Sequence, residues 1–382
     1  MPPFSTDRLD ALMDRAGIDA LVVTSGHNIR HLTGGHAHFM YEAMPAIGTS
    51  RYLPVLVYPK GRPDLAAYVG SSEKNALAND PIWVPNILHS RLGSVAAMRH
   101  AVEYLGKLPG APRTIGFEHG FMPADAADAL RAGFDASYVE AQRTLELMRA
   151  VKRPDELALL REASERVIDA MLSVVATHGP GQSKREIIEA LRRAETDRGL
   201  VFDYALVTLG ASLDRAPSDQ VWQPGELLCL DSGGNYRGYI GDLCRMAIDG
   251  APDAEMADLL MQVDAVQQAA RRLVRAGLRG GDIYAAAEPA LAACADKAHM
   301  HFVAHGMGLV SHEAPRLTGT GPIPYPGDDA DAPLEAGMVL SIETTLAHPR
   351  RGFVKLEDTV AVTAEGYEAF GDAGRGWNRA GA

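Results

Sequence analysis

The sequence predicts an α/β amino-terminal domain followed by an α+β carboxy-terminal domain. At 382 residues the chain is long for a single hydrophobic core, so two domains are expected. Through about residue 150, short apolar runs alternate with helical patterns, which is typical of an α/β unit. Beyond that point, two long helical patterns precede a series of short strands, as in an α+β domain. The expected domains are therefore residues 1–150 and 151–382.

The first domain begins with a helix, because apolar residues recur at Leu9, Leu12 and Met13 with helical spacing. Runs rich in β-forming residues follow, at residues 19–26, 28–35, 51–59 and 64–70. A further short strand at 113–119 leads into a helix at 125–134. This order of elements supports the α/β assignment.

The second domain begins with two helices whose ends are marked in the sequence. Pro154 suits the first turn of a helix, and a Gly-Pro-Gly segment at 179–181 ends it. Ser183 and Glu186 form a capping-box pattern for a second helix, which is expected to end near Gly199. Short strands are then expected at residues 204–210, 226–234 and 242–248, followed by helices through about residue 295 and by strands at residues 338–344 and 352–363.

Composition excludes several classes of function. A formal net charge of −12 disfavours binding to nucleic acid or to an anionic membrane, because contacts with phosphates need a basic surface. The three cysteines are too few and too scattered for a disulfide framework, which indicates a reducing compartment. No uncharged apolar run reaches the length needed to span a membrane. We therefore expect a cytoplasmic protein.

Two aspartates flank a glycine-rich segment between two strand-like runs. Asp231 is expected to end the first strand and Asp242 to open the second. Carboxylates at the inner ends of paired strands can converge, and they repel each other unless cations neutralise them. For this pair alone, capping of turns is the more common role.

Three more residues favour a metal site over turn caps. Glu343 and Glu357 each lie in an apolar strand, where an unpaired carboxylate would be costly. His305 adds an imidazole in the same half of the chain. Four carboxylates and one histidine match the hard, oxygen-rich ligand set of two divalent ions with a bridging hydroxide.

The order and spacing of these residues carry a resemblance to a known family. The motifs are D-x10-D from Asp231, H-x6-H-E-x-P from His305 and E-x13-E from Glu343. With them the chain resembles the pita-bread metallopeptidases, which include aminopeptidase P, prolidase, methionine aminopeptidase and the metal-free creatinases. Residues 28–35 and 147–163 are similar to the amino-terminal domain and linker of the aminopeptidase P, prolidase and creatinase branch. The resemblance implies a ribonuclease H-like α/β domain, a pita-bread catalytic domain and a homodimer.

The resemblance also implies a role for each site residue. Asp231 would bind one metal ion, Asp242 and Glu357 would bridge the pair, and His305 with Glu343 would complete the other site. The ions would be Mn²⁺ first, with Zn²⁺, Co²⁺ or Fe²⁺ as alternatives. A hydroxide bridging them would attack the scissile carbon of a C–N bond, and Glu343 would carry the proton to the leaving nitrogen. His301 and His312 would contact substrate and stabilise the tetrahedral intermediate.

Two positions depart from the peptidase pattern and leave the substrate open. Arg215 follows Asp214 where a substrate-contacting histidine is expected, and Lys355 stands where the peptidases often carry an arginine. Both are candidate substrate-binding residues. A Xaa-Pro peptide is the first expectation for the substrate. A small zwitterionic solute, as in ectoine hydrolases or dimethylsulfoniopropionate lyases of this fold, is the alternative, and a metal-free binding protein is the third.

Two smaller expectations concern histidines and glycines. His27, His31, His36 and His38 are expected to lie in a loop near the mouth of the active site, by similarity to the family, rather than to bind a metal. Gly306 and Gly308 are expected to let the backbone pass close to the metal ions.

Overall fold

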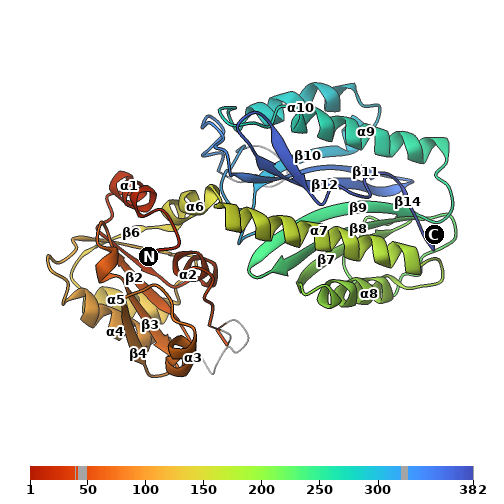
Figure 1. Cartoon of the computed structure of the whole chain (residues 1–382). Coiled ribbons are helices and arrows are strands. Elements are labelled where there is room, and N and C mark those ends of the chain that lie inside the picture. The colour runs from red at the N-terminus through yellow and green to blue at the C-terminus, as the bar shows by residue number, and fades with distance from the viewer. Residues whose placement is uncertain (39, 42–49, 320–325, 382) are drawn as a thin grey trace. The chain divides into compact units, whose positions relative to one another are not determined.

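The computed structural model describes residues 1–38, 40–41, 50–319 and 326–381. These residues form two compact units, 1–149 and 150–382 (Figure 1). Among the described residues no helix is both long and apolar enough to cross a lipid bilayer.

The first unit is a mixed sheet covered by helices. Its strands are β1 (Ala20–Val23), β2 (Val55–Pro59), β3 (Ala67–Ser71), β4 (Asn86–Ser90), β5 (Thr114–Phe117) and β6 (Ser137–Glu140). The sheet order is β4-β3-β2-β1-β5-β6, with antiparallel pairing through β1, β2 and β3 and parallel pairing of β1 with β5 and of β5 with β6. This arrangement agrees with the expected ribonuclease H-like α/β domain.

Helices cover both faces of this sheet. They are α1 (Thr6–Ala16), α2 (Gly26–Thr33), α3 (Lys74–Asn79), α4 (Ser94–Leu105), α5 (Ala124–Gly133) and α6 (Gln142–Ala150). Because side chains alternate along a strand, Leu21 and Val23 of β1 pack with α1, α2 and α6, whereas Ala20 and Val22 pack with α4 and α5. The α/β assignment for this unit is confirmed.

The strand-like interpretation of residues 28–35 is wrong. The expected loop is wrong for His27 and His31, which lie in helix α2, whereas His36 and His38 follow the helix outside any helix or strand. Most of residues 28–35 belong to helix α2. Ser25 caps its first turn by accepting a hydrogen bond from the Asn28 backbone N–H, and Gly34 ends it in the left-handed conformation. Ile29 and Leu32 are both buried, three residues apart, as expected for a helix with one apolar face.

The second unit is built on a larger, mostly antiparallel sheet. Its strands are β7 (Val201–Leu209), β8 (Leu227–Tyr236), β9 (Tyr239–Ile248), β10 (Met300–Gly306), β11 (Val339–His348), β12 (Gly352–Val362), β13 (Tyr367–Phe370) and β14 (Asn378–Arg379). The main path of the sheet is β10-β11-β12-β9-β8-β7, with β13 paired to β12 and β14 to β9. This is the expected pita-bread domain.

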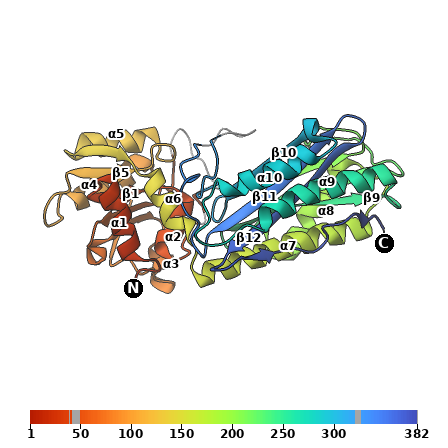
Figure 2. The same cartoon turned by 90° about the horizontal axis from the view of Figure 1, so that it is seen from above.

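Four helices cover this sheet, α7 (Pro154–Thr177), α8 (Lys184–Asp197), α9 (Ala254–Arg271) and α10 (Asp282–Ala293). Figures 1 and 2 show α7 lying along β8 and β9, and α9 and α10 lying near β10 and β11. On β8, Leu228 and Leu230 pack against the α7 and α8 layer. Strand alternation therefore places the intervening Cys229 and Asp231 on the opposite face of the sheet.

The glycine-rich segment between Asp231 and Asp242 is strand rather than connection. Strand β8 continues to Tyr236 and β9 starts at Tyr239, so both aspartates lie inside a long hairpin. Gly241 is needed because a Cβ there would lie 2.8 Å from the Ala163 carbonyl carbon of α7. Gly241 therefore allows the helix to approach the sheet, a packing reason that the sequence did not reveal.

Candidate metal centre

The five expected ligands come together around the junction of β9 and β12. Glu343 of β11 pairs in register with Glu357 of β12, and Glu357 pairs with Cys244 of β9. Cys244 in turn pairs with Asp231 of β8. Cross-strand pairs point to the same face of a sheet, so three carboxylates and Cys244 form a row across four strands. Three groups have donor atoms within 4.8 Å of one another: Asp231, Asp242 and Glu357; His305, Glu343 and Glu357; and Asp242, His305 and His312.

His305 has the environment of a ligand. Its side chain is buried on β10, and Nδ1 lies 3.1 Å from the Gly306 carbonyl oxygen. Nε2 lies 3.9 Å from Oε1 of Glu357 and has no hydrogen-bond partner among the described residues. A buried ring nitrogen without a partner costs free energy unless something binds it, and here it faces carboxylates. This donor set fits a divalent ion.

Burial and mutual repulsion raise the pKa values of the clustered aspartates. Burial, and then the negative charges of Glu357 and Asp231, hold the pKa of Asp242 well above its usual range. Burial also raises the pKa of Asp231. Both effects are typical of groups placed to bind a cation, since a bound cation favours the ionised form.

Lys355 supplies a positive charge at the middle of this cluster. Its Nζ lies 2.7 Å from Asp231 Oδ2, 2.6 Å from Glu343 Oε2 and 2.8 Å from Glu357 Oε2. The side chain is only 5% exposed. The sequence suggested substrate binding for Lys355, but the structure shows an ammonium held by three expected metal ligands.

Arg215 adds a second positive charge at Asp231. Its guanidinium pairs with Asp231 Oδ2 and lies over the ring of Phe353, with its Cζ 5.2 Å from the ring centre. One third of the side chain is exposed, so Arg215 reaches from the surface to the carboxylate. Substrate binding by Arg215 therefore remains a prediction. The structure adds an ion pair between Arg215 and Asp231, an expected metal ligand.

Sequence reasoning missed two residues that contact the ligands. Ser341 Oγ donates a 2.8 Å hydrogen bond to Glu357 Oε1, and the Tyr204 hydroxyl donates to Asp242 Oδ1. Ser341 is two residues before Glu343 on β11, so strand alternation could have identified it. Tyr204 lies across from Gly233, whose missing side chain leaves room for the tyrosine ring.

The two additional histidines occupy different environments. The ring of His312 stacks on that of His305, with centroids 3.7 Å apart and an interplanar angle of 17°. Burial, with smaller contributions from His305 and Lys355, lowers the pKa of His312 to about 3, so its imidazole is neutral. His301 is four residues before His305 on β10 and therefore on the same face, but it is exposed.

The segment after His305 is fixed by a buried ion pair. Glu313 accepts from Lys152 Nζ at 2.9 Å, and both side chains are almost completely buried. A Cβ on Gly306 would overlap the Ala314 carbonyl, and one on Gly308 would overlap the Glu313 carboxylate. These two glycines therefore make room for the segment that carries His312. The expected reason was a close approach of the backbone to the metal ions.

The four amino-terminal histidines have separate structural partners. His36 Nε2 lies 2.8 Å from Glu73 Oε1, and His38 Nε2 lies 2.9 Å from the Ser71 carbonyl oxygen. His31 stacks on Phe4, and His27 packs edge-on against Phe121. No potential metal site was found among these four described histidines.

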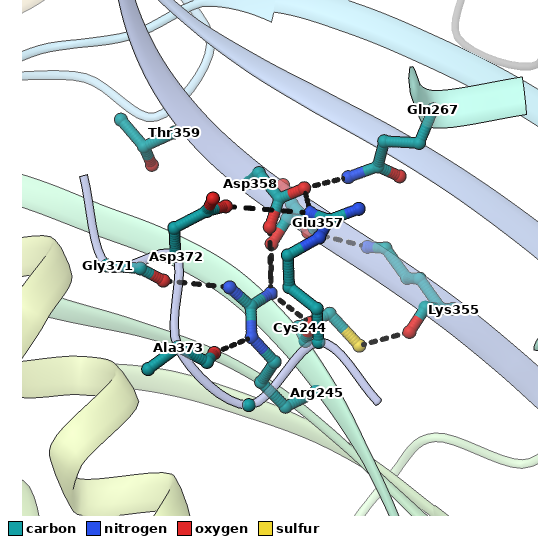
Figure 3. Close-up of polar contacts among 12 residues, drawn as sticks. Cys244, Arg245, Gln267, Lys355, Glu357, Asp358, Thr359, Gly371, Asp372 and Ala373 are labelled. Carbon is teal, nitrogen blue, oxygen red and sulfur yellow. Dashed lines mark hydrogen bonds and ion pairs between the residues drawn. The ribbon is translucent and has the colours of Figure 1, made fainter. Parts of the chain in front are cut away.

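A network behind the sheet supports Glu357. Arg245 of β9 points to the face opposite the metal ligands, where it pairs with Asp358 at 3.0 Å. Its guanidinium donates to the backbone carbonyls of Cys244, Glu357, Gly371 and Ala373 (Figure 3). Arg271 also pairs with Asp358, at 3.0 Å.

The comparisons with known proteins identify the family. The model of metallopeptidase family M24 matches residues 158–364, and the creatinase/prolidase N-terminal domain matches residues 6–151. The chain belongs to metallopeptidase family M24. Its ligand cluster lies entirely within the residues that the M24 model matches.

Several M24 relatives are similar over nearly their whole length. An uncharacterized peptidase of Bacillus subtilis, YqhT, is 25% identical over 94% of this chain and 95% of its own. The probable dipeptidase PepE of Mycobacterium tuberculosis is 27% identical over 92% of this chain and 89% of its own. Among solved structures, a Xaa-Pro dipeptidase from Bacillus anthracis superposes with a TM-score of 0.81 at 23% identity, covering 96% of this chain and 97% of the other. That structure supports the fold.

Proposed function

We propose that this M24 protein is a divalent-metal-dependent hydrolase that cleaves the C–N bond before proline in small Xaa-Pro peptides. The observation that carries the proposal is His305 Nε2, which is buried, has no partner among the described residues and faces Glu357 within a cluster of carboxylates. Support for the substrate class comes from relatives. One, from Pyrococcus horikoshii, is named Xaa-Pro dipeptidase and is 21% identical over 93% of this chain.

The chain's own residues have distinct tasks in this reaction. A divalent ion bound by these ligands supplies a Lewis acid and a water of lowered pKa. His312, as a neutral imidazole, donates a hydrogen bond to the substrate oxygen that becomes negative. Glu343, whose side chain is 13% exposed, transfers a proton to the leaving nitrogen. His301 contacts the substrate from the exposed end of the same strand face.

A zwitterionic solute remains the second candidate, because Arg215 and Lys355 replace residues of the peptidase pattern. A screen with the Mn²⁺-loaded protein separates the two substrates. It would contain Ala-Pro and Leu-Pro, longer Xaa-Pro peptides, ectoine and dimethylsulfoniopropionate, with products detected by mass spectrometry. We expect release of free proline from the dipeptides and no release by the His305→Ala variant. Turnover of ectoine or dimethylsulfoniopropionate without peptide cleavage would replace the peptide proposal with its alternative.

Three further properties belong to this proposal. Mn²⁺ is the preferred ion, since oxygen donors dominate the set, with Zn²⁺, Co²⁺ and Fe²⁺ as competitors. The three free cysteines fit a cytoplasmic location. A homodimer is expected from the family resemblance. Light scattering on the purified protein tests the last point, and a monomer across a range of concentrations would contradict it.

A further inference from the structure

The position of Lys355 has a consequence for how many ions the centre holds. Its Nζ contacts one oxygen each of Asp231, Glu343 and Glu357, at 2.6–2.8 Å. An ammonium donates three hydrogen bonds, so these three carboxylates satisfy it. All three were expected to bind metal. Lys355 contacts Asp231 and Glu357 of one potential ion site, and Glu343 and Glu357 of another.

Asp231 is the ligand most affected. Its Oδ2 accepts from both Lys355 and Arg215. An oxygen already bonded to two cationic donors has little electron density left to offer a metal ion. By contrast, His305 Nε2 has no hydrogen-bond partner among the described residues. The two halves of the cluster therefore differ. Asp231 contacts two side-chain cations, whereas the His305 half contacts Lys355 alone, through Glu343 and Glu357, and has a buried ring nitrogen without a partner among the described residues.

The charges lead to the same conclusion. The cluster has four carboxylates, those of Asp231, Asp242, Glu343 and Glu357, and two side-chain cations, those of Lys355 and Arg215. One divalent ion neutralises this set. A second ion would place excess positive charge in a buried site, where it is not screened by water.

We propose that the centre binds a single divalent ion on the His305 side, with donors from His305, Glu343 and Glu357, and that the ammonium of Lys355 takes the place of a second ion. The inference rests on the proposed metal-dependent function but differs from the two ions expected from the family resemblance. Lys355 also orients Glu343 and Glu357, because it bonds one oxygen of each, and Ser341 bonds the other oxygen of Glu357.

Metal stoichiometry tests this inference without an activity assay. The wild-type chain and the Lys355→Met variant would be stripped with a chelator and dialysed to equilibrium against Mn²⁺. Bound metal would be measured by plasma mass spectrometry and protein by amino-acid analysis. Lys297→Met is the matched control, because Lys297 is exposed and its ammonium donates to the Ala292 carbonyl oxygen, away from the metal centre. Circular dichroism checks that each variant is folded.

We expect about one ion per chain for the wild type and the control, and about two for Lys355→Met, since removing the ammonium opens the Asp231 half. Two ions bound by the wild type would overturn the inference and leave the metal-dependent function intact. One ion in both the wild type and Lys355→Met would show that Lys355 does not exclude the second ion. No ion in the wild type would overturn both the inference and the proposed function.

Discussion

Arg245 Nη1 donates a 2.9 Å hydrogen bond to the backbone carbonyl of Glu357, and a 2.8 Å bond to that of Cys244, its own neighbour. Glu357 and Cys244 are the one residue pair that joins β12 to β9 in register within the described chain. The guanidinium thus links β9 to β12 immediately behind Glu357, a proposed metal ligand (Figure 3). The position of Glu357 therefore depends on a residue that never faces the metal.

Replacing Arg245 with Met should lower both stability and metal affinity. The change removes a donor to the backbone carbonyls of Cys244, Glu357, Gly371 and Ala373, of which the first three bonds are buried, while Asp358 keeps Arg271. We expect the free energy of unfolding in urea to fall by about 3 kcal/mol. Calorimetry should show weaker Mn²⁺ binding. Arg350→Met is the control, since the Arg350 side chain is 76% exposed, and it should change stability by less than about 1 kcal/mol.

The role of His312 is tested by comparing turnover with metal content. Replacing His312 with Ala removes a hydrogen-bond donor to the developing negative charge but leaves the proposed metal ligands in place. We expect turnover to fall by on the order of a hundredfold or more, with Mn²⁺ content unchanged. Full turnover on the true substrate would show that this histidine serves only to shape the segment after His305.

Glu195 should make stability depend on pH. Burial raises the pKa of this carboxyl to about 7, against a hydrogen bond from Ser232 that lowers it. Its folded pKa lies above its unfolded value, so its contribution to stability is complete below about pH 4.5 and is lost as pH rises through about 7. In the metal-free protein, the free energy of unfolding of Glu195→Gln, measured relative to that of the wild type, should therefore increase by about 2–3 kcal/mol when the pH is raised from 4.5 to 8. A pH-independent difference in urea unfolding would contradict this.

The close approach of α7 to the sheet can be tested at a glycine. A Cβ at Gly241 would lie 2.8 Å from the backbone of Ala163 and Ser164, so Gly241→Ala should push the helix outward. We expect a loss of about 1–3 kcal/mol in the free energy of unfolding. Gly179→Ala, where no atom lies within 4 Å of the added Cβ, is the matched control and should be close to neutral.

The sequence predicted the helix ends, and it predicted which residues form the candidate metal cluster, better than it predicted what surrounds those residues. Pro154 and the Ser183 capping box are local signals, and helices α7 and α8 begin where they indicate. Asp231 and Asp242 were recognised as a pair, but their hairpin was misinterpreted, because glycine is also the residue of turns. Only tertiary structure shows that Gly241 makes room for a helix.

The contacts of Lys355 could not be predicted for a similar reason. Strand alternation places Lys355 on the same face as Glu357, which made contact with a substrate a reasonable expectation. Whether its ammonium meets a substrate or the ligands themselves depends on the distance between strands β8, β11 and β12. Similarly, the partners of His36 and His38 come from residues more than thirty positions away. Such long-range contacts leave no local pattern.

The central claim is that His305 and Glu357 hold a catalytic divalent ion. Anomalous diffraction from crystals of the Mn²⁺-loaded protein, recorded on the two sides of the manganese absorption edge, tests it directly. We predict a manganese peak bonded to Nε2 of His305 and to the carboxylate of Glu357, and its loss in the Glu357→Ala variant. A fully loaded crystal with no manganese peak in contact with His305 would contradict the claim.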